Sequence, residues 1–412
     1  MLAAIELLAS IPSPRGEERP LAEAVAAFGA ARWPAASWQV QDVEGPNSPC
    51  AQVVARSGDP ERGGLLLYSH LDTSLTGDAS FDTAVTGRAP VDPGATVDLA
   101  AGTVRGFGLG VAKAPAAAAL VAFGRAGERL AADGRRHSLR LLLAARGTHR
   151  APAWATGPPA PAARTGIERW LADGMRPDAA LVAKGGPAGV LHDEPGACYL
   201  RVRVSAGWGA VMNRAAVDPP GGLIAHLGDI TVAVQAAGDA VASAALTEMG
   251  DPGQSGACFG LGAVRSGQPT KADLVPGLVE VFGYLVLPGA IDPEPLADDV
   301  ARRVRAALAG TRLADAGVDA DVSVIHAGAS TRSDAAVVRA ARAAWDACLD
   351  RTGAQVSGWT GSTDGVALRA AGIQTARFGP SRTISADGCD VVDLAELLAL
   401  SRAYEQVAVE LG

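Results

Sequence analysis

The chain is short of basic residues, histidine, cysteine and aromatic side chains, and these shortages exclude several kinds of protein. Its 412 residues include 36 Lys and Arg against 44 Asp and Glu, which gives a formal net charge of −8. A protein that binds a nucleic-acid backbone needs a basic surface. We therefore expect no nucleic-acid partner.

The five cysteines form no CxxC pair and are odd in number, which predicts reduced thiols rather than a disulfide framework. No stretch of about 20 apolar residues is free of charge, so we expect no membrane-spanning helix and no membrane partner. The first residues lack a basic region ahead of their apolar run. We therefore expect no signal peptide and a cytoplasmic location.

Apolar residues are plentiful, at 48%, and the length suggests two domains. Continuous apolar runs at Gly64–Tyr68, Leu141–Ala145 and Ala179–Ala183 predict strands that are buried on both faces. Helical segments alternate with these runs, for example at Ala114–Ala126 and Gly166–Ala172. This order predicts an α/β fold with a mostly parallel sheet and helices on both of its faces.

The pattern changes after residue 197. Apolar and polar residues alternate in Tyr199–Val204, Phe259–Val264 and Val279–Leu287, which predicts an antiparallel sheet with one solvated face. The α/β pattern returns near the C-terminal end. We therefore predict a discontinuous α/β domain, residues 1–197 and 326–412, interrupted by an inserted α+β domain, residues 198–325.

Five segments, in this order, carry a resemblance that runs nearly end to end. They are IPSPRGEE from Ile11, LLLYSHLDT from Leu65, GFGLGVAKAPAAA from Gly106, GSTDG from Gly361 with the AAGIQTARFGP that follows, and the final VVDLAELLALSRAYEQ. Together they resemble the zinc metallopeptidase family of aminoacylase, acetylornithine deacetylase, succinyl-diaminopimelate desuccinylase and carboxypeptidase G. The resemblance implies a zinc-exopeptidase-like catalytic domain with an inserted lid, a possible homodimer through that lid, and a small amide- or carboxylate-bearing ligand.

In that family two zinc ions lie between five ligands, and a glutamate acts as general base. His70 matches the first ligand, and Asp72 matches the aspartate that steadies it. The other family positions, including that of the general base, hold Val111, Gly147, Thr148, Lys184 and Ala386. The lid histidine and lid arginine of the family fall at Val211 and Leu285. Zinc is the family's cofactor, but with these ligands lost we expect no metal and no other cofactor.

His70 and Asp72 are the candidate catalytic pair, since residues two apart lie on one side of an extended segment at a strand end. A structural hydrogen-bonded pair is the alternative. Arg146 and Lys184 follow apolar strands in a region where the family has acids, so we expect them, with Lys113, to hold an anionic group of the substrate. The alternative is that these cations are solvated. Asp364 is a further substrate-binding candidate, although helix N-capping is its ordinary role.

Three functional hypotheses follow. The first is a metal-independent hydrolase or transferase that uses His70 as base, Asp72 to orient it and the cations to hold charge. The second is a catalytically inactive pseudoenzyme that binds a small ligand or a protein partner; a pocket filled by Phe107, Trp359 or the Pro-rich loop would favour it. The third is a metallohydrolase with relocated ligands, such as His70 with His149, Asp387 or Cys389.

Overall fold

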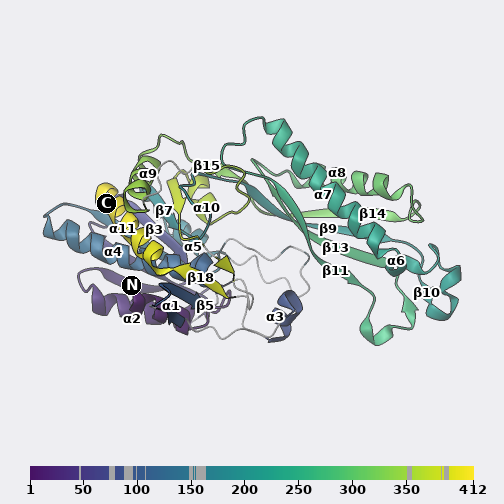
Figure 1. Ribbon diagram of the computed structural model, residues 1–412, viewed down its shortest axis with the longest axis horizontal. Coiled ribbons are helices and arrows are strands. Elements are labelled where there is room, and N and C mark those ends of the chain that lie inside the picture. The colour runs from purple at the N-terminus through teal and green to yellow at the C-terminus, as the bar shows by residue number, and fades with distance from the viewer. Residues whose placement is uncertain are drawn as a thin grey trace.

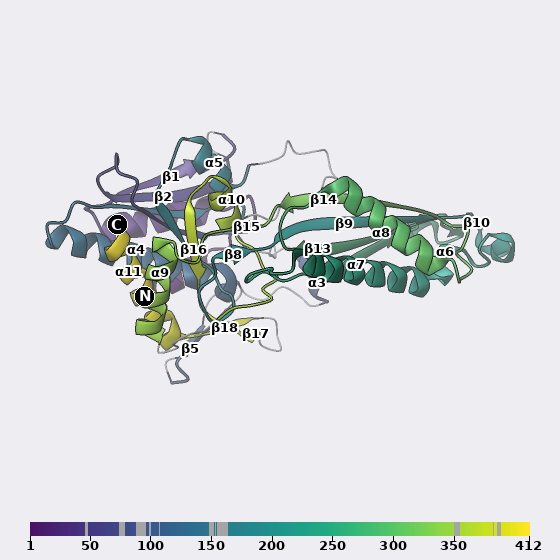
Figure 2. The same cartoon turned by 90° about the horizontal axis from the view of Figure 1, so that it is seen from above.

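The protein is described by a computed structural model, which covers residues 1–45, 48–73, 79–87, 96–98, 100–106, 108–147, 152, 154, 164–349, 355–381, 383–384 and 389–412. Two parts are visible in Figure 1, one that holds both chain ends and one built around α7 and α8. Each part has its own sheet. Turned by 90°, the sheets stay in separate parts, with β8 and β15 near their junction (Figure 2).

The first part is built on a six-stranded sheet with the order β1-β2-β6-β3-β7-β16. The pairings among β6, β3, β7 and β16 are parallel, and β1 and β2 add an antiparallel edge. The strands are β1 (Ser37–Asp42), β2 (Ala51–Gly58), β3 (Leu65–His70), β6 (Ser138–Ala144), β7 (Ala179–Ala183) and β16 (Gln374–Phe378).

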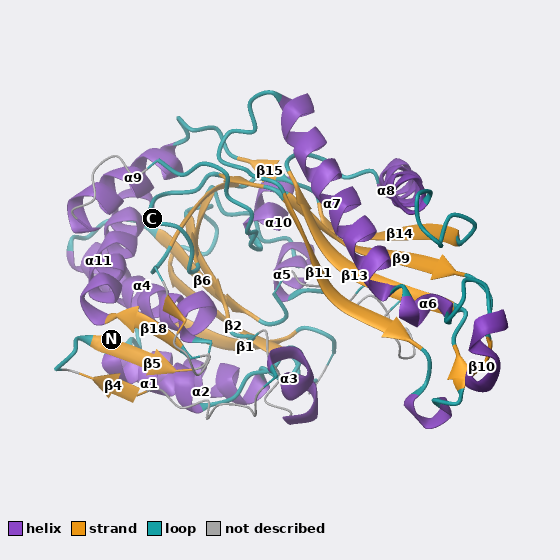
Figure 3. Ribbon diagram, turned by 45° about the vertical axis from the view of Figure 1, so that its right-hand side comes forward, coloured by secondary structure: helices purple, strands orange, loops and turns teal. Residues whose placement is uncertain are grey.

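Both faces of this sheet are covered because its central strands are apolar throughout. Leu65 and Leu67 of β3 pack into one buried cluster, whereas Leu66 and Tyr68 pack into another. Figure 3 shows helices on both sides. The helices of the larger cluster are α1 (Leu2–Ser10), α2 (Arg19–Arg32), α4 (Ala114–Ala132), α9 (Ala336–Leu349) and α11 (Leu394–Leu411), and those of the other are α5 (Gly166–Ala172) and α10 (Gly365–Ala370).

The second part contains a four-stranded antiparallel sheet with the order β11-β13-β9-β14. Alternate residues of β9, such as Leu200 and Val202, pack beneath the helices, which explains the alternating pattern in the sequence. The elements are α6 (Gly222–Ala225), α7 (Leu227–Met249), α8 (Pro293–Leu308), β9 (Gly196–Ser205), β11 (Cys258–Ser266), β13 (Leu278–Leu287) and β14 (Gly317–His326). The strand β14 was not predicted, although Val318, Ala320 and Val322 alternate with polar residues along it and pack on the core.

Short elements complete the described chain. A π-helical turn, η1, leads directly into α4 and places Lys113 at its end. The elements are α3 (Ala79–Thr86), β4 (Thr96–Asp98), β5 (Thr103–Gly106), η1 (Leu109–Lys113), β8 (Asp193–Glu194), β10 (Gly209–Ala210), η2 (Val211–Ala216), η3 (Pro269–Lys271), β12 (Leu274–Val275), β15 (Ala329–Ser330), β17 (Thr383–Ile384) and β18 (Asp390–Asp393).

The expected α/β class, with a mostly parallel sheet and a separate antiparallel sheet, is confirmed. The expectation that no helix spans a membrane stays a prediction. Two helical segments, Leu109–Ala132 and Leu227–Met249, are long and apolar enough by length and composition alone. The most apolar window of the first is 89% buried inside the protein, and that of the second is 39% buried.

Candidate functional site

The candidate site lies where the parallel strands of the central sheet end. β3 ends at His70, β7 is followed by Lys184, and β6 is followed by Arg146 and Gly147. Carboxyl ends of parallel strands meet at one edge of a sheet, which is where open α/β folds bind ligands. The structure therefore brings several, but not all, of the predicted residues together.

His70 and Asp72 form the predicted pair. His70 Nδ1 lies 3.1 Å from Asp72 Oδ1 and 3.1 Å from the Asp72 carbonyl oxygen. Both oxygens can only accept when the carboxyl is ionised, so Nδ1 carries the proton and Nε2 carries the lone pair. Nε2 is buried and makes no hydrogen bond within the described part of the chain. It is therefore available to accept a proton.

The surroundings of Asp72 favour its charged form. Burial alone would raise the pKa of Asp72, but the charge and hydrogen bond of His70, the N–H of Gly147 and the charge of Lys184 together lower it to about 2. The N–H of Gly147 donates to Asp72 Oδ1 at 2.8 Å. Asp72 is therefore a fixed carboxylate that orients His70.

Lys184 lies in the same buried cluster and is only 7% exposed. Burial lowers the pKa of its ammonium group, while the nearby carboxylates of Asp364 and Asp72 act in the opposite direction. Lys184 is one of only three lysines in the chain, and Lys113 is buried as well. A lysine changes its pKa readily when buried, whereas an arginine stays charged.

Asp364 precedes α10, but it does not cap that helix with its side chain. Its Oδ2 instead accepts a short hydrogen bond from the hydroxyl of Tyr68, which lies two residues before His70. Its Oδ1 is buried and makes no hydrogen bond within the described residues. Burial raises the pKa of Asp364, and Lys184 and His70 oppose that shift. The N-capping expectation is therefore wrong, because Tyr68 draws the carboxylate toward the sheet.

Lys113 is not solvated. It is 1% exposed, and its Nζ donates a 2.9 Å hydrogen bond to the carbonyl oxygen of Ile11. Burial lowers the pKa of Lys113 to about 8. Its ammonium group thus ties the turn before α4 to the segment that follows α1.

Arg146 needs a larger correction, because it does not share a site with Lys184. Its guanidinium pairs with both carboxylate oxygens of Glu44. Arg146 has a left-handed backbone, with φ of 51°, and its N–H donates to Glu18 at 2.9 Å. Arg146 is therefore held by Glu44 and Glu18, whereas Lys184 lies near Asp72 and Asp364.

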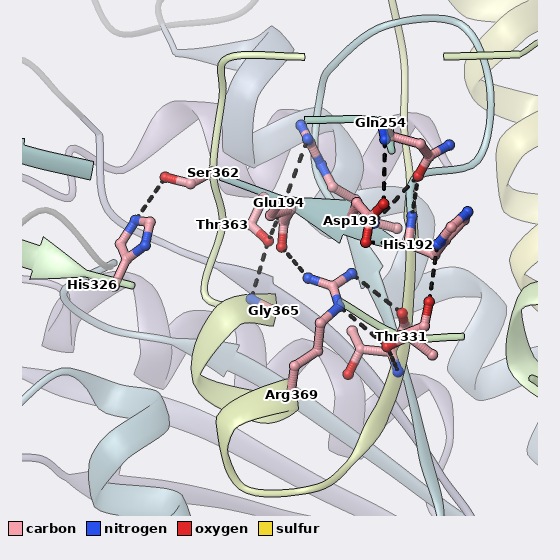
Figure 4. Close-up of polar contacts among 12 residues, drawn as sticks. His192, Asp193, Glu194, Gln254, His326, Thr331, Ser362, Thr363, Gly365 and Arg369 are labelled. Atoms are coloured by element: carbon pink, nitrogen blue, oxygen red, sulfur yellow. Dashed lines mark hydrogen bonds and ion pairs between the residues drawn. The ribbon is translucent and has the colours of Figure 1, made fainter. Parts of the chain in front are cut away.

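The sequence analysis missed a buried ion cluster beside the site, drawn in Figure 4. Glu194 pairs with Arg369 and accepts a 2.7 Å hydrogen bond from Thr363, and Arg377 NH1 lies 3.8 Å from Glu194 Oε1. Arg377 also stacks on Trp359, with 4.8 Å between its guanidinium carbon and the ring centroid. A charged residue inside the apolar strand β16 is the signal that could have revealed this cluster.

The structure also joins two residues that the sequence did not single out. His326, at the end of β14, lies with Nε2 2.8 Å from Ser362 Oγ (Figure 4). Both side chains are half-buried. Lys184 is close enough to act on the pKa of His326, so this pair belongs to the same region as His70.

Comparison with known proteins agrees with this architecture. No protein-family model matches the chain, and no curated protein matches its sequence. Solved structures match over nearly the whole chain. Human carnosine dipeptidase 1 has a TM-score of 0.68 at 12% identity, with 100% of this chain and 95% of that chain covered. A tripeptidase from Staphylococcus aureus has a TM-score of 0.66 at 14% identity, with 100% of this chain and 97% of that chain covered. An M20 family metallo-carboxypeptidase from Sulfolobus solfataricus has a TM-score of 0.65 at 13% identity, with 99% of this chain and 98% of that chain covered.

The chain has the fold of the M20 metallopeptidases. This likeness confirms the fold predicted from the five segments, and identities of 12 to 14% show the fold alone.

The described residues do not fit the two-zinc centre that the M20 fold implies. His70 Nε2 could bind a metal, because the Asp72 carboxylate accepts from Nδ1–H and holds the ring in the orientation that a metal ligand needs. However, no three His, Cys, Asp or Glu side chains within the described residues come together to hold an ion, and Cys389 joins no such group. Lys184 adds a positive charge instead. Phe107, Thr148, His149, Ala386 and Asp387 lie outside the described residues, so relocation of ligands to His149 or Asp387 stays a prediction.

Proposed function

We propose that this M20-fold chain is a metal-independent hydrolase of a small amide, of the short-peptide or N-acyl amino acid class. The observation that carries the proposal is the state of His70. Asp72 holds its Nδ1–H, and its Nε2 is a buried acceptor that makes no hydrogen bond to any described residue, at the carboxyl edge of the sheet. The substrate class is supported by the tripeptidase, carnosine dipeptidase and carboxypeptidase among the similar structures.

His70, Lys184 and Asp72 each have a separate role in the proposed reaction. His70 Nε2 takes a proton from water as the water oxygen adds to the amide carbon. The ammonium of Lys184 stabilises the negative oxygen that develops, because it lies in the same water-poor cluster. His70 then gives its proton to the leaving nitrogen, which departs as an amine. Asp72 keeps the imidazole oriented throughout.

The test combines metal analysis with kinetics. Purified protein is treated with a chelator, analysed for zinc, cobalt and manganese by plasma emission spectrometry, and assayed by mass spectrometry against dipeptides, tripeptides and N-acyl amino acids. We expect hydrolysis to persist in chelator. His70→Ala should lower kcat/KM by roughly 10²–10⁴-fold, and Lys184→Met by roughly 10²–10³-fold.

The chain offers matched controls. His226→Ala alters another His–Asp pair, with 3.7 Å between His226 Nδ1 and Asp229 Oδ2, in the part that carries the antiparallel sheet. Lys271→Met removes the exposed lysine. Both should keep wild-type kinetics. Activity that disappears in chelator and returns with metal would favour relocated ligands, and a ligand bound without turnover would favour the pseudoenzyme.

The resemblance also implies a homodimer through the antiparallel part, and we keep it as a proposal. Support comes from apolar side chains that stay exposed there, with Met212 at 92%, Trp208 at 72% and Val232 at 69%. Light scattering coupled to gel filtration tests it. A monomer mass at micromolar concentration would remove the proposal.

A further inference from the structure

We propose that Ser362 is a nucleophile activated by His326, so that the amide hydrolysis proposed above proceeds through an acyl group carried on Ser362. This inference rests on the proposed function and adds to it a covalent step and two residues. Ser362 lies in the GSTDG segment, but no pattern in the sequence pairs it with His326, because 36 positions separate the two.

The hydrogen bonds fix which atom donates. His326 Nδ1 lies 3.1 Å from the carbonyl oxygen of Ala327, which can only accept, so Nδ1 carries the ring proton. Nε2 is therefore the acceptor, and the hydroxyl of Ser362 donates to it at 2.8 Å. This is the arrangement of a serine nucleophile with its histidine base, with a backbone carbonyl as the group that orients the ring.

The surroundings suit a base at neutral pH. Burial lowers the pKa of His326 below its usual value, and the positive charge of Lys184 adds to the shift, whereas Glu194 acts in the opposite direction. The ring is thus neutral and able to take a proton. The hydroxyl of Tyr284, on β13 of the same antiparallel sheet, also hydrogen-bonds with Ser362.

The local fold places the histidine of the pair at a cavity. The register of β14 shifts between Val324 and His326, so the strand ends irregularly at the histidine. His326 lines a cavity of about 520 Å³ whose wall includes Ile325, Leu171 and Val366 together with Glu168. A mostly apolar wall with few polar groups is typical of a small-molecule site.

A second Ser–His pair in the same chain shows what distinguishes this one. Ser57 Oγ lies 3.0 Å from His137 Nε2, and His137 Nδ1 lies 3.0 Å from the carbonyl of Arg135. That pair has the same local geometry, but it lies where β2 ends and β6 begins, at the edge of the sheet opposite His70. Neither Ser57 nor His137 lines the cavity that His326 lines. This second pair is therefore a natural control.

The chemistry balances without a further reactant. Ser362 Oγ adds to the amide carbon while its proton passes to His326 Nε2, and Lys184 stabilises the oxyanion. The carbon–nitrogen bond breaks, and the nitrogen takes the proton from His326 and leaves as an amine. Water then attacks the ester on Ser362, which releases the acid and restores the hydroxyl. His70 takes the proton of that water and returns it to Ser362 Oγ.

The experiment uses a fluorophosphonate probe on the full chain, followed by intact mass and peptide mapping. We expect one adduct per chain on Ser362 of the wild-type protein. Ser362→Ala should give none, and His326→Gln should lower the labelling rate by at least tenfold. Ser57→Ala and His137→Gln should label like the wild type.

The outcomes separate this inference from the proposed function. No adduct on Ser362 in wild-type protein that still hydrolyses amides in chelator would overturn the nucleophile and leave His70 acting directly on water. An adduct on Ser362 without turnover of any amide would support the nucleophile and count against the proposed function. If Ser362→Ala and His326→Gln only lower the melting temperature, and no adduct maps to Ser362, the pair is a structural link and the inference fails.

Discussion

The N–H of Gly147 donates to Asp72 Oδ1 at 2.8 Å, and a Cβ at position 147 would lie 3.3 Å from Asp72 Oδ2. In the family that the sequence resembles, this part of the chain carries two adjacent glutamates, one of them a metal ligand and the other the general base. Here the side chain is absent, and the backbone serves the His70–Asp72 pair instead. The backbone of Gly147 therefore holds the carboxylate of Asp72.

Gly147→Ala should disturb the His70–Asp72 pair, because the added Cβ would lie close to the Asp72 carboxylate. We expect a loss of about 1 kcal/mol in unfolding free energy and a fall of roughly tenfold in kcat/KM, because the added methyl group also lies 3.7 Å from His70 Nδ1. Urea denaturation and the amide assay measure the two effects. Gly310→Ala is the control, since a Cβ there meets nothing within 4 Å. Wild-type kinetics for Gly147→Ala would show that the contact is not needed.

Asp72 should make stability depend on pH in acid. Its pKa of about 2 in the folded chain lies below the unfolded value, so the carboxylate stabilises the fold above about pH 4, and this contribution is lost as the pH falls toward 2. We expect about 2 kcal/mol. Urea denaturation from pH 5 to pH 2 should give a shallower decline for Asp72→Asn than for the wild type. Equal slopes would mean that Asp72 is not held as a carboxylate.

Because the chain has only three lysines, the pKa of each ammonium group can be measured directly. Protein labelled with ¹³C at lysine Cε should give three signals, assigned by Lys→Arg substitution one at a time. We expect the Lys113 signal to titrate with a pKa near 8 and that of Lys184 below the usual lysine range, because burial disfavours both charged forms. A Lys184 signal that titrates at or above that range would remove the argument that it lies in a desolvated cluster.

Two buried tyrosines give a matched pair of hydroxyl deletions. The Tyr68 hydroxyl donates to the carboxylate of Asp364, whereas that of Tyr404 donates to the carbonyl of Phe378 at 2.8 Å. Tyr68→Phe leaves the Asp364 carboxyl without its donor, so we expect a loss of about 2–3 kcal/mol. Tyr404→Phe should cost about 1 kcal/mol. Equal losses in chemical denaturation would contradict a charged acceptor at Asp364.

Glu194→Gln should be strongly destabilising because it leaves Arg369 and Arg377 buried without a carboxylate. We expect a loss of about 3–5 kcal/mol. Arg332→Ala breaks an exposed ion pair with Asp334, with 2.7 Å between Arg332 NH2 and Asp334 Oδ2, and should cost less than about 1 kcal/mol. Thermal and urea denaturation compare the two. A small loss for Glu194→Gln would show that water reaches the cluster.

Much of the fold could be predicted from local pattern. The apolar runs that became β3, β6 and β7 had to be buried on both faces, and the predicted bounds of α5 and β7 agree with the structure. The strand β14 was missed although its own residues carry the signal, since Val318, Ala320 and Val322 alternate with Asp319, Asp321 and Ser323. Its pairing partner β9 could not be predicted from that alternation, because pairing joins segments far apart in the chain.

The central sheet and the His70–Asp72 pair could be predicted from the chain alone, because burial pattern and a spacing of two residues are local properties. The directions of the cationic side chains could not, because they depend on partners distant in the chain. Arg146 and Lys184 both follow buried strands, yet Glu44 engages the first outside the site, while Asp72 and Asp364 enclose the second. The contact between Ser362 and His326 likewise joins segments that are far apart in the chain. The direction of a charged or polar side chain depends on partners that only folding brings within reach.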